Sequence, residues 1–256
     1  MAFDKVVDSA LLDAGMQATA DAIREKTGST DPIVWDSANG FKTAVEGIQA
    51  GGGDDGSFKA VIERTAVNPT LPADLTKIGN YAFYGSTNLA LTSLPNSVTS
   101  IGENAFDSCK NLVLTSLPDS LTSIGKKAFW YCSKLALTSL PKNLRTIGAN
   151  AFAGCDCVAF TSLPENITYV DNSTFNSCKN IKTLYLPKVL NIYSNAFAGC
   201  SGLEEVTFGS KASIASSSFS SCPNLLTINV PWAEGEVSGA PWSATNATIN
   251  YNYTGG

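Results

Sequence analysis

A phenylalanine recurs through most of this chain at nearly constant spacing, and this repeat constrains the fold more than any other feature. The spacing is 23 residues four times and then 22 residues twice. The seven members are Phe83, Phe106, Phe129, Phe152, Phe175, Phe197 and Phe219. A unit of this length cannot bury its apolar face alone, so successive units must stack into a continuous core. The sequence therefore predicts a solenoid with the phenylalanine column in its interior.

The other apolar positions of the unit have separate roles. The third unit, residues 117–139, reads LPDSLTSIGKKAFWYCSKLALTS. Leu and Ile at this spacing predict leucine-rich repeats, with one strand per unit in a parallel ladder and an irregular or short-helical opposite side. The Pro after Leu ends the strand because proline donates no ladder hydrogen bond. The Gly after Ile, as in Ile124-Gly125, predicts a turn with positive φ.

The unit LP-x-x-L-x-x-I-G-x-x-A-F-x-x-C-x-x-L resembles the BspA-like leucine-rich repeat over residues 71 to about 230. The resemblance implies a solenoid with a role in adhesion or surface recognition. It identifies no ligand.

The strand register in the LALTSLP segments has two interpretations. In the fifth unit, Leu184 and Leu186 alternate as one buried strand face should. The same frame turns four threonines inward, namely Thr92, Thr115, Thr138 and Thr161, and four apolar side chains outward, namely Leu91, Leu114, Leu137 and Phe160. Either the strand shifts locally, or these units carry an exposed apolar stripe of the kind that marks contact surfaces.

The second interpretation gives a candidate ligand-binding surface on the ladder. Its residues are Leu91, Ser93, Leu114, Ser116, Leu137, Ser139, Phe160 and Ser162. Small polar side chains beside apolar ones suit an extended glycan or peptide. The simpler alternative is that the serines only tolerate strand geometry.

Six of the seven cysteines lie three residues after their phenylalanines, and we expect them to be structural. They are Cys109, Cys132, Cys155, Cys178, Cys200 and Cys222. Ser86 occupies this position in the first unit, so it favours a small side chain rather than a thiol. An evenly repeated column has no natural disulfide pairs, and a linear array does not converge tetrahedrally on zinc. Cys157 lies outside the column. We expect no disulfide framework, no metal and no cofactor.

The chain divides into four segments. Residues 1–50 predict a small α-helical head, with Asp8 and Asp36 as helix N-caps. Residues 51–57 form a Gly-rich linker, residues 58–230 the solenoid, and residues 231–256 a C-terminal cap. The aromatic residues of the last segment, Trp232, Trp242, Tyr251 and Tyr253, either shield the open core or stack on sugar rings.

Both ends resemble segments of tail-associated structural proteins of phages and prophages. The stretches that carry this resemblance are VDSALLDAGMQATADAIREKTGSTDPIVW with the FKTAVEGIQAGGG junction, and VPWAEGEVSGAPWSATNATINYNY at the C-terminus. The resemblance implies that residues 1–50 dock on other virion proteins or form a homo-oligomer.

Composition argues against several classes of function. The chain has no His, which removes the usual general base and metal ligand. Its net charge is −5, without a basic run, which argues against nucleic-acid binding. No nucleotide-binding, metalloprotease or serine-hydrolase motif occurs, and residues 1–20 do not resemble a signal peptide. No apolar run has the roughly 20 residues of a membrane span.

Together these features predict a non-enzymatic recognition protein that binds a cell-surface protein or glycan. The leading hypothesis is a phage or prophage tail protein located in the virion. The alternative is a bacterial BspA-like adhesin, located on the cell surface or secreted, that binds host protein or glycan.

Overall fold

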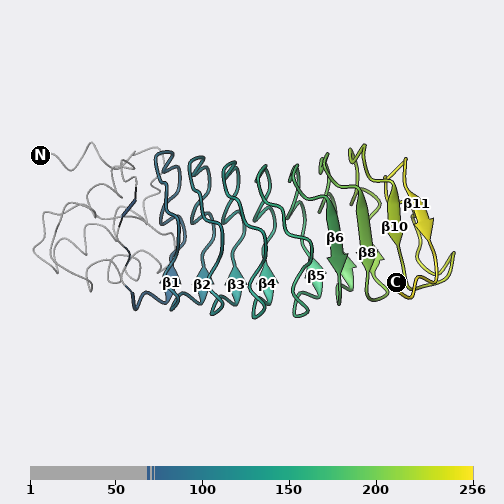
Figure 1. The fold of residues 1–256 in the computed structure, drawn as a ribbon, viewed down its shortest axis with the longest axis horizontal. Coiled ribbons are helices and arrows are strands. Elements are labelled where there is room, and N and C mark those ends of the chain that lie inside the picture. The colour runs from purple at the N-terminus through teal and green to yellow at the C-terminus, as the bar shows by residue number, and fades with distance from the viewer. Residues whose placement is uncertain (1–67, 70, 72, 256) are drawn as a thin grey trace, which may run out of the picture.

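The computed structural model describes residues 68, 69, 71 and 73–255, which form a parallel β-solenoid whose turns follow one another along one axis (Figure 1). Its short strands are β1 (Lys77–Ile78), β2 (Ser100–Ile101), β3 (Ser123–Ile124), β4 (Thr146–Ile147), β5 (Tyr169–Val170), β7 (Asn191–Ile192) and β9 (Ser213–Ile214). Its longer strands are β6 (Thr183–Leu186), β8 (Glu205–Phe208), β10 (Thr227–Asn229) and β11 (Thr248–Asn250).

The short strands form a first line of parallel pairs. Strands β1 to β4 make one four-stranded sheet, and β5, β7 and β9 make a three-stranded one. Equivalent residues of successive units are directly opposite, as in the pairing of Ile101 with Ile124. This in-register pairing confirms that each repeat is one turn of the solenoid.

The longer strands form a second line that begins only in the fifth unit. Its sheet has the order β11-β10-β8-β6, and every pair is parallel. In the earlier units the corresponding LALTSLP segments are not regular strands, although single backbone bonds still join them. The amide of Ala136, for example, donates to the carbonyl of Leu114 at 3.1 Å.

The phenylalanine column lies in the interior. Rings of successive turns stack nearly parallel, with centroids 5.1–5.6 Å apart and interplanar angles of 2–13°. The backbone amide of each of these phenylalanines also donates a hydrogen bond to the next turn, as Phe106 does to the carbonyl of Ala128 at 2.7 Å. Because offset-stacked aromatic pairs add to the burial of their area, the column joins the turns into one core.

The strand register follows the local shift, and the exposed apolar stripe is wrong. Leu91, Leu114, Leu137 and Phe160 are buried, whereas Thr92, Thr115, Thr138 and Thr161 are exposed. In the first unit Leu89, Leu91 and Leu94 point inward, and two exposed residues separate the last two. Burial of all three side chains outweighs strict alternation, so the backbone takes a two-residue outward step.

The expectation of positive φ at the Gly after Ile is also wrong. Gly102, Gly125 and Gly148 are absent from the residues with positive φ. A Cβ on Gly125 would lie 2.6 Å from the carbonyl carbon of Gly102 in the preceding turn. Glycine is needed here because adjacent backbones approach too closely for a side chain.

Positive φ occurs instead two residues after each phenylalanine and two residues before every phenylalanine except Phe219. The earlier position holds Tyr81, Asn104, Lys127, Asn150, Ser173 and Asn195, with φ between 52° and 58°. The later position holds Gly85, Ser108, Tyr131, Gly154, Ser177, Gly199 and Ser221, with φ between 54° and 74°. The backbone bends at these two points to turn the phenylalanine inward.

The side of the coil that joins the two strand lines contains turns rather than helices within residues 73–255, so the short-helical alternative is wrong there. The predicted helical head and the Gly-rich linker lie outside the described residues.

The last segment folds over the end of the core. Trp242 is fully buried, its carbonyl accepts from the amide of Phe219 at 3.1 Å, and Trp232 packs edge-on against Phe208. Neither tryptophan presents a ring face to solvent, whereas Tyr251 and Tyr253 are half-buried. For the tryptophans, shielding of the core is the arrangement observed.

Candidate binding surface

The four serines of the predicted ligand surface remain exposed. Ser93, Ser116, Ser139 and Ser162 each precede the inward Leu of the LP pair, and all four point to solvent. Their predicted apolar neighbours Leu91, Leu114, Leu137 and Phe160 are buried and cannot contact a ligand. The apolar half of that prediction is therefore corrected, because these side chains fill the core.

The serine column continues into the regular strands. Ser162 pairs with Tyr185, Tyr185 with Thr207, and the pairing then runs on to Asn229 and Asn250. We call the whole set the outer row: Ser93, Ser116, Ser139, Ser162, Tyr185, Thr207, Asn229 and Asn250. It crosses eight turns without a charged member.

A hydrogen-bond network fixes the C-terminal end of the outer row. The side-chain amide of Asn229 donates to Oε1 of Glu205 at 2.7 Å and to Oγ1 of Thr207 at 3.0 Å. The amide of Asn250 donates to Oδ1 of Asn229 at 2.7 Å. Asn229 is buried among these partners, and because buried polar groups need such satisfaction, the row is preorganised here.

Tyr185 is the largest side chain of the outer row. It is 45% exposed and lies between the smaller side chains of Ser162 and Thr207 in the adjacent turns. A Cβ on Gly209 would lie 2.7 Å from its hydroxyl, so the absence of a side chain there leaves room for the tyrosine. Its ring is therefore supported by the next turn and open to solvent.

Sequence reasoning missed the part of the outer row from Tyr185 onward. The repeat spacing could have revealed it, because the members from Ser162 to Asn250 follow one another at intervals of 23, 22, 22 and 21 residues. The spacing of the phenylalanines shortens in the same region. The polar network among Glu205, Thr207 and Asn229 depends on cross-strand neighbours and has no sequence signature.

The six-cysteine column is buried and makes an unanticipated contact. Each Sγ lies 2.9–3.2 Å from the carbonyl of the phenylalanine in the preceding turn, as Cys132 does with Phe106. Burial raises the pKa of the Cys132, Cys178 and Cys200 thiols well above the usual range, and raises that of Cys222 to about 11. Such thiols are protonated and poorly nucleophilic at neutral pH.

The cysteines of residues 73–255 form no disulfide. No three His, Cys, Asp or Glu side chains gather as metal ligands within that part of the chain. The hydroxyl of Ser86, which replaces the thiol in the first unit, is buried and finds no hydrogen-bond partner among the described residues.

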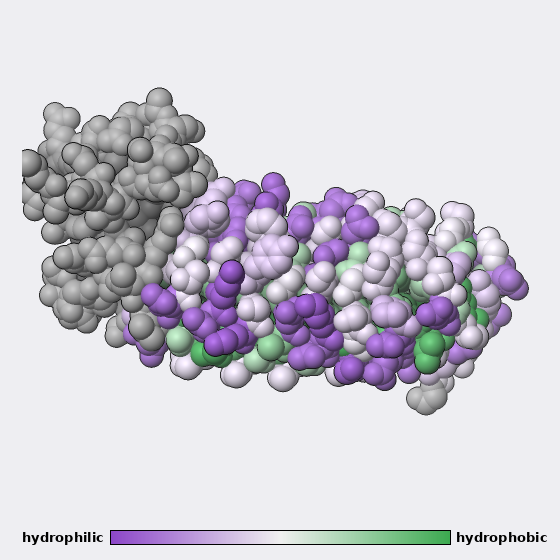
Figure 2. All heavy atoms as spheres, turned by 90° about the horizontal axis from the view of Figure 1, so that it is seen from above, coloured by the Kyte–Doolittle hydropathy of each residue, from purple (hydrophilic) through white to green (hydrophobic). Residues whose placement is uncertain are grey.

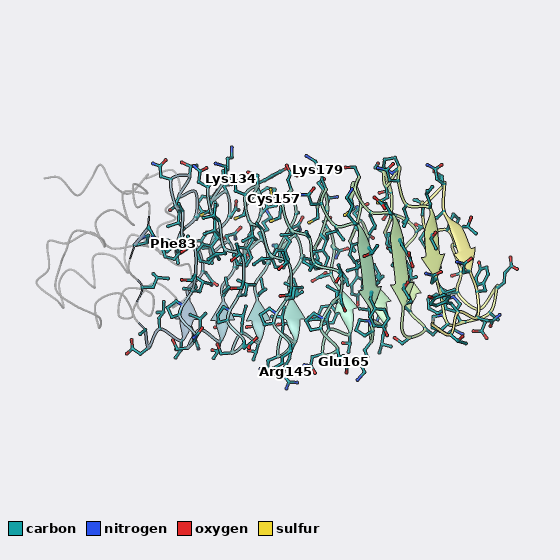
Figure 3. All side chains as sticks on the ribbon, in the orientation of Figure 1. Phe83, Lys134, Arg145, Cys157, Glu165 and Lys179 are labelled. Carbon is teal, nitrogen blue, oxygen red and sulfur yellow. The ribbon has the colours of Figure 1, made fainter. Side chains whose placement is uncertain are left out.

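Charged side chains lie along the edges of the solenoid. Lys134 and Lys179 lie at the upper edge and Arg145 and Glu165 at the lower one (Figure 3). Pairs such as Lys188 with Glu165, 2.9 Å apart, join adjacent turns, and hydrogen bonding from Lys188 lowers the pKa of the Glu165 carboxyl. The face seen from above is mostly hydrophilic or near neutral, with scattered hydrophobic residues (Figure 2).

The chain is similar to a described family. The family described as BspA type leucine rich repeat region matches residues 57–182 and 138–238, in six copies. Among the curated proteins, no relative matches the chain.

Solved structures of leucine-rich repeat proteins are similar as well. The Treponema pallidum leucine-rich repeat protein is 30% identical over 62% of this chain and 78% of its own, with a TM-score of 0.54. A leucine-rich cell surface protein from Faecalibacterium prausnitzii is 22% identical over 69% of this chain and 62% of its own, with a TM-score of 0.40. A Bacteroides ovatus leucine-rich repeat protein is 17% identical over 73% and 84%, with a TM-score of 0.38.

Within the part of the chain that the structure describes, no helix has the length and apolar character needed to cross a bilayer.

Proposed function

Because the chain belongs to the BspA-type leucine-rich repeat family, we propose that it is a non-catalytic recognition protein that contacts an extended partner through the outer row. The observation that carries this proposal is the continuity of the row across eight turns, from Ser93 to Asn250. Within the row, Asn229 is buried and hydrogen-bonds its neighbours Thr207 and Asn250.

The chemistry of the outer row suits an extended glycan or peptide. Adjacent parallel strands lie about 4.8 Å apart, so hydroxyl and amide groups recur at a regular interval along the solenoid. A ligand with its own repeating polar groups pairs with several of them at once. Tyr185 adds one apolar ring face, and aromatic rings with a polar tip are enriched at recognition surfaces.

Two biological settings fit this activity. The termini resemble phage and prophage tail proteins, which favours a virion protein that docks through residues 1–50 and reads a bacterial envelope. The repeats resemble those of BspA-like adhesins, which favours a cell-surface or secreted protein that binds host protein or glycan.

The partner is tested first with the labelled full chain, applied in parallel to bacterial envelopes and to host epithelial cells with their matrix. Binding to bacteria alone supports the virion setting, and binding to host material alone supports the adhesin setting. Binding to neither contradicts a recognition function.

The surface is tested with matched variants of the full chain. Ser116→Arg and Ser139→Arg together place two bulky charges on the outer row and should abolish binding to whichever material the wild type recognises. The control is Thr146→Arg with Asn191→Arg, which places the same charges on exposed positions of the short strands β4 and β7. Equal loss in both double variants would contradict the outer row as the contact surface.

A further inference from the structure

The turn after β3 differs from its six counterparts at one position, and it combines that difference with two further large side chains. The second position after the phenylalanine holds Tyr131, where the other turns have Gly or Ser. The first position after the phenylalanine holds Trp130, where the first turn has Tyr84 and the others have Asp, Ala, Asn or Ser. The second position before it holds Lys127, where the first turn has Tyr81 and the others have Asn or Ser. The seven turns therefore serve as internal controls for one another.

Tyr131 is unfavourable for stability. Its φ is 54°, a left-handed conformation that glycine adopts freely and that costs energy in a bulky residue. The repeat enforces this conformation, since the amide of Tyr131 donates to Ala153 at 2.8 Å. Its side chain nevertheless stays 52% exposed. Strain combined with an exposed ring suggests a functional reason for the residue.

Trp130 and Tyr131 form an aromatic platform. Their ring centroids are 4.9 Å apart, with planes tilted by 39°. The Tyr131 ring lies against Gly154 of the next turn, where a Cβ would come within 2.5 Å of its Cδ1. The neighbouring turn thus leaves room for the ring to lie on its backbone. Trp130 is half-buried.

Lys127 adds a cation that makes no ion pair among the described residues, although its charge opposes the rise that burial causes in the pKa of the Asp107 carboxyl in the preceding turn. Its Nζ lies 4.2 Å from the centre of the Trp130 ring, whereas the adjacent Lys126 pairs with Glu103. No carboxylate within ion-pair distance of Lys127 occurs in residues 73–255. Residues 120–155 also contain five Lys and Arg and no Asp or Glu, so this part of the solenoid favours an anionic ligand.

The size of the platform argues for a small ring rather than a protein partner. Protein interfaces use apolar patches of several hundred Å² or more, whereas the Trp130–Tyr131 platform is formed by a single turn. Asp107 and Ala153 take the place of Trp130 in the turns on either side. A pyranose has one C–H face that stacks on an aromatic ring and a polar edge that takes hydrogen bonds.

We propose that Trp130, Tyr131 and Lys127 form a binding site for a glycan containing uronic acid. The pyranose ring stacks on the exposed Tyr131 ring, and its carboxylate accepts a hydrogen bond from Nζ of Lys127, which lies over the Trp130 ring. This site lies in the turn after β3, apart from the outer row, and adds a second contact of defined chemistry.

The test is calorimetric titration of the full chain with oligosaccharides of galacturonate, of mannuronate and of alternating glucuronate and N-acetylglucosamine. Each is compared with its carboxyl-reduced form. Wild type should bind at least one of them and prefer the acidic form. Binding of none, or equal binding of both forms, overturns the proposal.

The variants use residues that the repeat already accepts. Tyr131→Ser copies Ser108, Ser177 and Ser221 and should weaken binding about tenfold, while the thermal midpoint stays equal or rises because strain is relieved. Lys127→Asn copies Asn104, Asn150 and Asn195 and should remove the preference for the carboxylate.

Tyr185→Ser on the outer row is the matched aromatic control and should leave this affinity unchanged. Unchanged affinity in Tyr131→Ser, or equal loss in Tyr185→Ser, would overturn the site. A wild-type chain that binds uronate oligosaccharides but neither bacterial envelopes nor host material would instead contradict only the proposed function.

Discussion

The first four turns and the last three build the same core with different ladders. In the early turns the fourth residue before the proline of the LALTSLP segment is apolar and buried, as in Leu137. In the late turns the third residue before the equivalent position is apolar and buried instead, as in Leu184, Val206 and Ile228. The late pattern alternates through β6, β8 and β10, so regular strands form there. The early pattern interrupts alternation with two exposed residues, and the longer strands are absent from those turns.

A one-residue displacement of an apolar side chain therefore decides whether a strand is regular. A slip of one residue normally turns side chains to the opposite face. In the early turns the Leu and Phe side chains of these segments all stay buried, and the backbone departs from regular strand geometry instead. The phenylalanine column, which is continuous through both regions, holds the turns in place while the ladder changes.

The largest expected effect is shared by the two regions and comes from alkaline pH. Burial raises the pKa of Cys132 and Cys155 in the early turns and of Cys178, Cys200 and Cys222 in the late ones. A thiol whose pKa is raised in the folded state stabilises the fold fully at a pH below its unfolded pKa of about 8.5. Above that pH, each such thiol lowers the free energy of unfolding by about 1.4 kcal/mol per pH unit. Stability should fall on the order of 10 kcal/mol by pH 10.

Chemical denaturation of the full chain between pH 7 and 10 checks this. Cys132→Ser and Cys200→Ser should reduce the slope of stability against pH equally, by one ionising group each. A stability that stays constant to pH 10 contradicts the burial of the column, and unequal reductions would show that one region opens independently.

The next effect tests whether the core is common to both regions. Phe129→Ala and Phe197→Ala each remove a ring stacked on both sides, at 5.3–5.6 Å. Each should lower the free energy of unfolding by about 3–5 kcal/mol through loss of burial and cavity formation. Urea denaturation measures both. A near-unchanged stability in either variant would remove that ring from the shared core.

The third prediction addresses the ladder itself at one equivalent position. Leu184→Ala in β6 should cost about 2–5 kcal/mol, because the side chain is buried. Thr138→Ala, at the same position of an early turn, should change stability by at most about 0.5 kcal/mol, because the side chain is exposed. Thermal unfolding compares them, and equal effects would mean that the two regions share one register.

The smallest effect concerns the glycine that only the early turns require. Gly125→Ala should cost about 1–3 kcal/mol, because a Cβ would lie 2.6–2.9 Å from backbone atoms of the preceding turn. The late turns have Asp171, Tyr193 and Ala215 at this position, so spacing there already admits a side chain. Ala215→Gly should therefore cost about 1 kcal/mol or less. Equal stability of wild type and Gly125→Ala, measured by thermal unfolding, would contradict the close approach.

The repeating architecture and the contents of the core follow from the sequence alone. A 22- or 23-residue period of large apolar side chains has one way to bury them, so the parallel stacking and the phenylalanine column follow from spacing alone. The serines were also visible as a column, because each occupies the same place in its unit.

The strand register, the need for glycine after the Ile of the early turns and the extent of the outer row could be read only from the folded chain. Each depends on atoms of the neighbouring turn: the competition between alternation and burial at Leu137, the backbone of Gly102 against Gly125, and the amide contacts of Asn229. The aromatic platform also depends on the folded chain, because the sequence contains Trp130 and Tyr131 but does not indicate their exposure or their backbone conformation. A one-dimensional pattern specifies which side chains must be inside, and the packing of adjacent turns settles how the backbone achieves it.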